Sequence, residues 1–210
     1  MKPERAYVSF ADYMASEEKT PHRHEFVDGE MYAMSGSSRP HNLLQSNLHL
    51  LTGNAAKRTA NCVVLGSSMK LYIEKRNSVY YPDLTVACDP SDKDDSYLRR
   101  PCFVVEVLSP STAHIDRREK RVSYQTLPSL QEYLIVEQDR MRAYLHVRRA
   151  GVWLVQILTQ PEDIVTCSCL NLRMTLQEIY DGVLFPPFGV EEPQLEYGLT
   201  APSEPIYDLQ

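Results

Sequence analysis

The segment CFVVEVLSP, residues 102–110, constrains the fold most, because it is an almost unbroken apolar run with a single acid inside it. A run of this kind fits a β-strand that is covered on both faces, as in the centre of an α/β sheet. Its acid, Glu106, then lies where a carboxylate is costly unless it is paired, hydrogen-bonded or bound to a metal ion. The segment therefore predicts a layered fold and a candidate site at once.

Helical and strand patterns alternate along the rest of the chain. Before this strand we expect two helices, over 7–18 and 40–58, the first with Ser9 as its N-cap. Between them we expect a hairpin with arms Glu25–Val27 and Glu30–Met34. Two strands, at 62–74 and 79–88, should follow the second helix. After it we expect helices over 112–127 and 171–182, a strand at 132–137, and a hairpin of 142–148 with 152–158. The interleaving predicts an α/β fold with a central mixed sheet flanked by helices. We expect one domain, residues 1–183, and a proline-rich acidic C-terminal arm, residues 184–210.

A second acid, Asp83, also lies within an apolar strand segment, YYPDLTVAC. If the two strands are neighbours, Asp83 and Glu106 could share a divalent cation, and Glu25 could approach it from the N-terminal hairpin. Oxygen ligands of this kind suit Mg²⁺ or Mn²⁺. Alternatively, each acid forms an ion pair with a nearby arginine or lysine, or a hydrogen bond with a backbone amide. This is the usual explanation for an isolated buried acid. Two such acids on adjacent expected strands favour the metal site.

The helix expected after Glu106 adds a cation. Asp116, Lys120 and Tyr124 are spaced by four residues and so share one helix face. Lys120 could reach a scissile phosphate or an attacking water, but Asp116 and Lys120 could equally form an ordinary helix-surface pair worth a few tenths of a kcal/mol. His41, at the start of an earlier helix, could point toward the acids or bond locally.

These strings resemble a known family. PD at 82–83, VVEVLSPST around Glu106 and the following DRREKRVSY resemble the Uma-type family of restriction endonucleases, within the PD-(D/E)xK nuclease superfamily. HEFVDGEMYAMS, followed by His41, resembles the N-terminal part of the same family. The resemblance extends from about Tyr7 to about Leu158.

The resemblance implies a restriction-endonuclease-like fold and hydrolysis of DNA phosphodiester bonds with Mg²⁺ or Mn²⁺. It implies that Asp83, Glu106 and the main-chain carbonyl of Val107 bind the metal, and that Glu25 supports it directly or through water. All three acids are then also catalytic residues.

The resemblance breaks down at one position. The lysine of the superfamily motif should stand two residues after the acid, where this chain has Leu108. The resemblance suggests that the catalytic lysine has moved to the following helix, as Lys120. His41, Asp116 and Tyr124 would support the site.

The overall charge limits how the chain could bind nucleic acid. The formal net charge is −6 and the pI about 5.5, which argues against binding phosphates over the whole surface. A local basic patch stays compatible with these values. The candidates are Arg99, Arg100, Arg117, Arg118, Lys120 and Arg121, unless they form only a solvated face. We also leave open a homodimer.

The cysteines and the apolar segments indicate the compartment. Five cysteines without a CxxC pair argue against a disulfide framework and favour a reducing cytoplasm. Cys88 and Cys102 are expected in the core, and the CxC of Cys167 and Cys169 is weak evidence for a metal site. The N-terminus has no signal-peptide pattern, and no apolar stretch is long enough to cross a membrane.

Three hypotheses remain from the sequence. The first is a Mg²⁺-dependent endonuclease acting on DNA, which the acids and Lys120 favour. The second is a catalytically inactive nuclease fold that binds DNA or protein, which the missing strand lysine and the acidic pI favour. The third is an α/β protein whose buried ion pairs serve stability alone.

Overall fold

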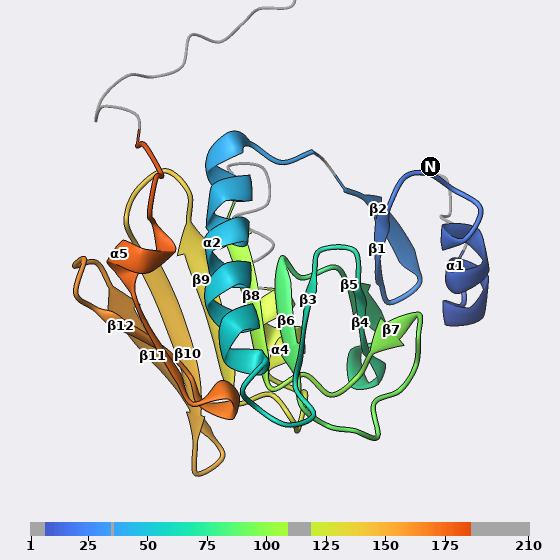
Figure 1. Ribbon diagram of the computed structural model, residues 1–210. Helices are drawn as coiled ribbons and strands as arrows, with labels where there is room; N and C mark the ends of the chain where they lie inside the picture. The colour runs from blue at the N-terminus through green and yellow to red at the C-terminus, as the bar shows by residue number, and fades with distance from the viewer. Residues whose placement is uncertain (1–6, 35, 109–118, 186–210) are drawn as a thin grey trace, which may run out of the picture.

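The structure, a computed structural model, describes residues 7–34, 36–108 and 119–185. Its centre is a six-stranded sheet in the order β11-β10-β9-β8-β6-β3 (Figure 1). Strands β8 and β9 pair in parallel, and the other neighbours pair antiparallel. The strands are β3 (Val63–Gly66), β6 (Leu84–Ala87), β8 (Phe103–Leu108), β9 (Glu132–Glu137), β10 (Ala143–Arg149) and β11 (Val152–Leu158). The expected central mixed sheet is therefore confirmed.

A second sheet of five strands lies beside the first, in the order β2-β1-β5-β4-β7. Its strands are β1 (His24–Val27), β2 (Glu30–Ala33), β4 (Lys70–Ile73), β5 (Ser78–Tyr80) and β7 (Tyr97–Leu98). The β1–β2 hairpin turns at Asp28 and Gly29, both with positive φ, as the Asp-Gly pair predicts. This sheet matters for the site because it carries Glu25.

Helices cover both faces of the six-stranded sheet. The long helix α2 (Arg39–Ala56), capped by Ser38, lies across one face of the sheet (Figure 1). Its buried leucines Leu44 and Leu48 pack in the core on that face. On the other face, α4 (Arg121–Tyr124) packs into a second core that also contains residues of the five-stranded sheet. Helix α1 (Phe10–Glu17), capped by Ser9 as expected, packs against β1. No described helix is long and apolar enough to cross a membrane.

Two expected strands are each broken into two. Residues 62–74 form β3 and β4, and residues 79–88 form β5 and β6, so that each pair is divided between the two sheets. The second break falls at Pro82 and Asp83, because proline has no N–H to continue a ladder. The two breaks allow the chain to connect the sheets, and the second one leaves Asp83 at the junction between them.

The expected helix over 171–182 is wrong in its first half. Residues 164–175 form a hairpin of β12 (Ile164–Cys167) and β13 (Leu172–Thr175), joined through the 3₁₀ turn η3 (Ser168–Leu170). The left-handed backbone of Asn171 ends that turn. Helix α5 (Leu176–Ile179) begins only after Thr175, which forms a capping box with Glu178. Because Thr175 caps the helix, it begins at Leu176, later than the residue 171 that the apolar spacing predicts.

The cysteines also differ from expectation. Cys62 and Cys88 form one disulfide, Cys102 and Cys169 form another, and Cys167 is a buried free thiol. An odd number of cysteines without a CxxC pair gave no sign of this, because the pairing joins segments that only the fold brings together. Cys102 does lie in the core, as expected, and Cys88 packs against it.

Candidate active site

Strand β8 directs Glu106 away from α2. Side chains alternate along a strand, and Val105 and Val107 pack in the core beneath α2. Val104 and Leu108 pack in the core beneath α4. Glu106 shares the face of these last two residues and is 3% exposed. Its carboxylate therefore lies between the two sheets, where it needs polar partners.

Asp83 lies beside β8 in the plane of the sheet. The β6–β8 register pairs Leu84 with Val105, so continuing it by two residues places Pro82 opposite Val107. Proline has no N–H to offer this position. The amide of Val107 instead donates to Oδ2 of Asp83 over 2.6 Å. The PD pair thus places a carboxylate next to Glu106 where β6 would otherwise continue.

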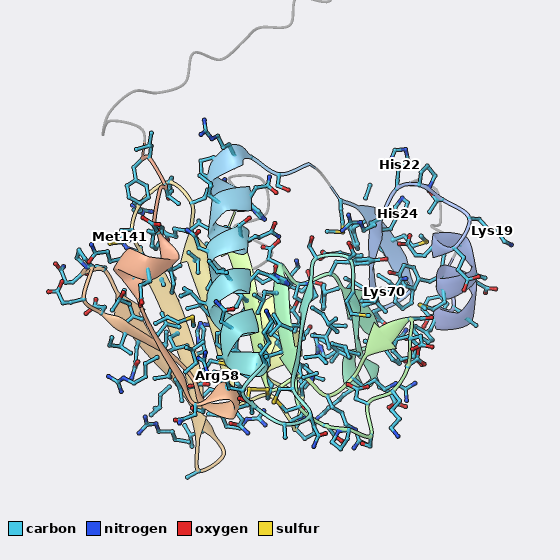
Figure 2. The ribbon with its side chains drawn as sticks, viewed as in Figure 1. Lys19, His22, His24, Arg58, Lys70 and Met141 are labelled. Carbon is cyan, nitrogen blue, oxygen red and sulfur yellow. A yellow bond between two sulfur atoms is a disulfide. The ribbon has the colours of Figure 1, made fainter. Side chains whose placement is uncertain are left out.

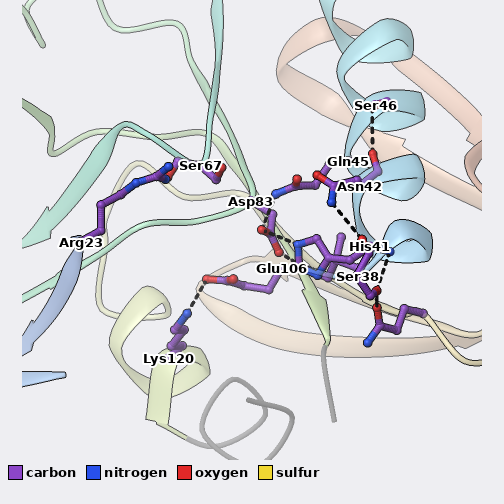
Figure 3. A network of polar contacts seen from close by, with 12 residues as sticks. Arg23, Ser38, His41, Asn42, Gln45, Ser46, Ser67, Asp83, Glu106 and Lys120 are labelled. Carbon is purple, nitrogen blue, oxygen red and sulfur yellow. Dashed lines mark hydrogen bonds and ion pairs between the residues drawn. The ribbon is translucent and has the colours of Figure 1, made fainter. Parts of the chain in front are cut away.

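Helix α2 holds the other oxygen of Asp83. Nε2 of His41 lies 2.9 Å from Oδ1, and Nε2 of Gln45 donates to the same oxygen over 2.5 Å (Figure 3). The sequence analysis included His41 but missed Gln45. Its position four residues after His41, on the same helix face, was the available signal. Asp83 therefore receives its partners from α2 and β8, whereas Glu106 receives them from the opposite layer.

Lys120 connects the two sheets. Its Nζ lies 2.7 Å from Oε1 of Glu25 and 3.3 Å from Oε1 of Glu106, and the residue is 5% exposed. It also lies 5.6 Å from the centre of the Tyr80 ring, within range of a cation–π contact. Glu25 faces Lys120 because Phe26, the next residue on β1, packs against α1 on the opposite face.

Tyr124 fixes the position of Glu106. Its hydroxyl donates to Oε1 of Glu106 over 2.6 Å. Complete burial, followed by the nearby Glu106 charge, raises the pKa of Tyr124 well above its ordinary value. The hydroxyl therefore stays protonated and remains a donor. Leu108, at the motif position usually held by lysine, packs in the same core as Tyr124.

The structure brings most of the expected site residues together. Glu25, Glu106, Lys120 and Tyr124 form one polar cluster, and Asp83 and His41 form a second beside it. Figure 3 shows Glu106 and Lys120 of the first cluster next to Asp83 and His41 of the second. The two clusters meet at the peptide between Glu106 and Val107. Asp116 lies outside the described residues.

The expected basic patch does not form around Arg99 and Arg100. These residues precede β8 at the end of the strand opposite Glu106, where Arg100 pairs with Asp89. Arg99 lies over the rings of Tyr72 and Tyr97. Arg117 and Arg118 lie outside the described residues. Lys120 is buried in the ion pairs above, so it is no part of a surface patch.

The donor atoms at this junction fit a hard divalent cation. Asp83 and Glu106 offer carboxylate oxygens, the type that Mg²⁺ and Mn²⁺ prefer. The carbonyl of Val107 points to the same side of β8 as its N–H, toward Asp83 and opposite Pro82. The three acids do not form a ready-made cage. Within the described residues, three potential ligand groups lie within 4.8 Å of one another only in a cysteine cluster.

A groove gives access to Asp83. It encloses about 480 Å³ and is lined by Gln45, Ser46, His49, Leu65, Gly66, Ser67, Ser68, Met69 and Asp83. Arg23, an exposed residue, donates from Nη1 to the carbonyl of Ser67 over 2.5 Å at this loop (Figure 3). A ligand in the groove would therefore contact Asp83 from the solvent side while Lys120 stays behind the acids.

Comparison with known proteins identifies relatives of this chain. Residues 10–177 match the Uma2 family, described as "Putative restriction endonuclease". The uncharacterized protein slr1290 of Synechocystis is 35% identical over 180 residues, covering 85% of this chain and 94% of that protein. Another uncharacterized Synechocystis protein, sll1609, is 36% identical over 154 residues, covering 70% and 85%.

A solved structure shares the fold. It comes from Anabaena variabilis and is described as a "putative nuclease belonging to DUF820". The TM-score is 0.63 at 14% sequence identity, and the match covers 81% of this chain and 98% of that one. With the family match extending over most of the sequence, the chain belongs to the Uma2 family of nuclease-like proteins.

Proposed function

We propose that this protein is a metal-dependent endonuclease that hydrolyses DNA phosphodiester bonds. The observation that carries the proposal is the position of Lys120, buried between Glu25 and Glu106 and next to the Asp83 junction. If this ion pair served stability alone, it would not need Asp83, a further carboxylate that lines a groove, beside it. Nuclease chemistry uses both parts, the acids for a metal ion and the lysine for the attacking water.

The site residues would have different roles in this reaction. Asp83, Glu106 and the carbonyl of Val107 would hold a Mg²⁺ or Mn²⁺ ion. Such an ion neutralises phosphate charge and makes a bound water more acidic. Lys120 would orient the attacking water through its ammonium and stabilise the charge that develops on the phosphate. Glu25, 2.7 Å from that ammonium, would hold it in place.

Supporting residues restrict the motion of the acids. The hydroxyl of Tyr124 holds Oε1 of Glu106, and His41 and Gln45 hold Oδ1 of Asp83. Because metal affinity and geometry depend on such partners, they belong to the proposed machinery. The groove beside Asp83 would admit the DNA backbone, with Arg23 near its rim.

One pair of observations favours a second candidate, an inactive nuclease fold that binds DNA or protein. Leu108 occupies the usual lysine position and is buried among apolar side chains. Asp83 already accepts hydrogen bonds from His41, Gln45 and the amide of Val107. A carboxylate with these partners can be stable without a metal ion.

A cleavage assay with a matched binding assay tests the proposal. The full chain is incubated with supercoiled, linear and single-stranded DNA in Mg²⁺, Mn²⁺ or chelator, and binding is measured in parallel. We expect metal-dependent cleavage that Asp83→Ala abolishes and that Asp89→Ala, an acid at the far end of the β6–β8 pair, leaves intact. Binding without cleavage would favour the second candidate. If the protein neither bound nor cleaved DNA, the acids would have a structural role only.

Several expectations stay predictions. These are a homodimer, a cytoplasmic location, and the division into a domain of residues 1–183 and a C-terminal arm of residues 184–210.

A further inference from the structure

All five cysteines gather at the end of the β6–β8 strand pair opposite the acids. Cys88 directly follows β6 and Cys102 directly precedes β8, whereas Asp83 and Glu106 lie near the other ends of these strands. Cys62 directly precedes β3, and Cys167 and Cys169 lie at the end of β12 and in η3. Figure 2 shows yellow sulfur atoms near Arg58, beyond the C-terminal end of α2.

The two disulfides are in contact with each other. Sγ of Cys88 lies 3.7 Å from Sγ of Cys102, across the two pairs. The sulfur atoms of Cys88, Cys102 and Cys169 all lie within 4.8 Å of one another. Sγ of Cys62, bonded to Cys88, is also 4.0 Å from the carbonyl oxygen of Cys169. The sulfurs of Cys88, Cys102 and Cys169 therefore form one compact cluster, and Cys62 adjoins it through its bond to Cys88.

This spacing matches a tetrathiolate metal site. Zn²⁺ binds four cysteine sulfurs tetrahedrally at about 2.3 Å, which places neighbouring sulfurs roughly 3.8 Å apart. The contact between Cys88 and Cys102 already has this length. Thiolates also select soft ions over the hard ions that suit the acidic site.

We propose that the reduced protein binds one Zn²⁺ through Cys62, Cys88, Cys102 and Cys169, and that the two disulfides are its oxidised, metal-free state. Reduction by a dithiol gives each disulfide two electrons and two protons, and each dithiol becomes a disulfide. Binding of Zn²⁺ to the four thiols then releases four protons and forms four Zn–S bonds.

The site would join segments that are far apart in the sequence. It would tie η3 of the β12–β13 hairpin to β3, β6 and β8. Its ligands lie at the end of β6 and the start of β8, and the acids lie at the other ends. Zinc binding should therefore stabilise the sheet without taking the place of the acidic metal site.

Cobalt spectroscopy on the reduced full chain tests the proposal. The protein is reduced with a dithiol, the reductant is removed without oxygen, and Co²⁺ is added. We expect one equivalent to give sulfur-to-cobalt charge-transfer and tetrahedral d–d bands, and one equivalent of Zn²⁺ to abolish them. We also expect Zn²⁺ to raise the melting temperature by more than about 5 °C.

Two variants identify the ligands. Cys88→Ser should lose the tetrahedral bands, whereas Cys167→Ser should keep them, since Cys167 is a buried cysteine beside the cluster and outside the proposed set. Asp83→Ala should also keep them, which separates this site from the acidic one. Circular dichroism reports whether each variant is folded, and the wild-type titration decides the case if Cys88→Ser does not fold.

Three outcomes would overturn the proposal. One is a reduced, folded wild type that gives no tetrahedral cobalt bands. Another is a loss of the bands in Cys167→Ser as large as in Cys88→Ser, with both variants folded. The third is an iron-containing, brown protein after anaerobic purification, which would assign the cluster to iron and sulfide instead of zinc.

Discussion

The ammonium of Lys120 lies 2.7 Å from Oε1 of Glu25. Lys120, just before α4, therefore forms an ion pair with a residue of the five-stranded sheet. The same nitrogen lies 3.3 Å from Oε1 of Glu106 on the central sheet. Because one cation lies between the carboxylates of Glu25 and Glu106, the site and the packing of the two sheets depend on the same contact.

Lys120→Ala should reduce DNA cleavage by about 10²–10⁴-fold, the usual scale for a positioned acid–base group. Because the variant leaves Glu25 and Glu106 without their cation, we also expect it to lose roughly 3 kcal/mol of stability. Single-turnover cleavage and urea unfolding measure the two effects.

Two further variants separate charge from position. Lys120→Arg should restore stability in part but little activity, because a guanidinium is bulkier and holds its protons. Leu108→Lys combined with Lys120→Ala could return the charge to the strand position of the motif. Full cleavage by Lys120→Ala, measured under conditions where it is folded, would show that another residue provides the catalytic cation.

Asp83→Ala and Glu106→Ala should each weaken Mn²⁺ binding, measured by calorimetry without DNA. Asp83→Ala should also destabilise the protein, because it leaves His41, Gln45 and the amide of Val107 without their acceptor. Equal Mn²⁺ affinity in wild type and the double variant would exclude these acids as ligands.

Tyr124→Phe should lower cleavage by about 10-fold, because Glu106 loses the hydroxyl that holds its Oε1. The matched control is Tyr180→Phe, which removes a buried hydroxyl that donates to the carbonyl oxygens of Glu137 and Arg142, away from the site. Each variant should lose about 1 kcal/mol of stability. If both reduced cleavage equally, the effect of Tyr124→Phe would be one of stability only.

Stability should decrease at mildly acidic pH through His146. Burial, followed by the nearby charge of Arg121, lowers the pKa of His146 from 6.5 to about 4. Below pH 6.5 the unfolded chain therefore binds a proton that the folded chain does not, and stability falls until about pH 4. The loss amounts to as much as about 3 kcal/mol.

Urea unfolding at several pH values measures this effect. His146→Gln should reduce the slope of stability against pH between these values, whereas His22→Gln, a change at an exposed histidine, should leave it unchanged. An unaltered slope in His146→Gln would assign the acid sensitivity to other groups.

The sequence determined the local features of the fold and the residue types of the site. Ser9 predicted the cap of α1, Asp28-Gly29 the first hairpin, and the apolar run around Glu106 the central strand. These features depend on neighbouring residues, so one segment carries the whole signal. The motif strings also indicated Asp83 and Lys120 as candidates.

Only the tertiary structure decided how these parts meet. The bond of Asp83 to the amide of Val107, for example, depends on the register between two strands. The contact of Lys120 with Glu25, and the meeting of Cys88 with Cys102, likewise join segments that are separate in the chain. Local patterns cannot specify such contacts, because each depends on how several strands and helices pack at the same time.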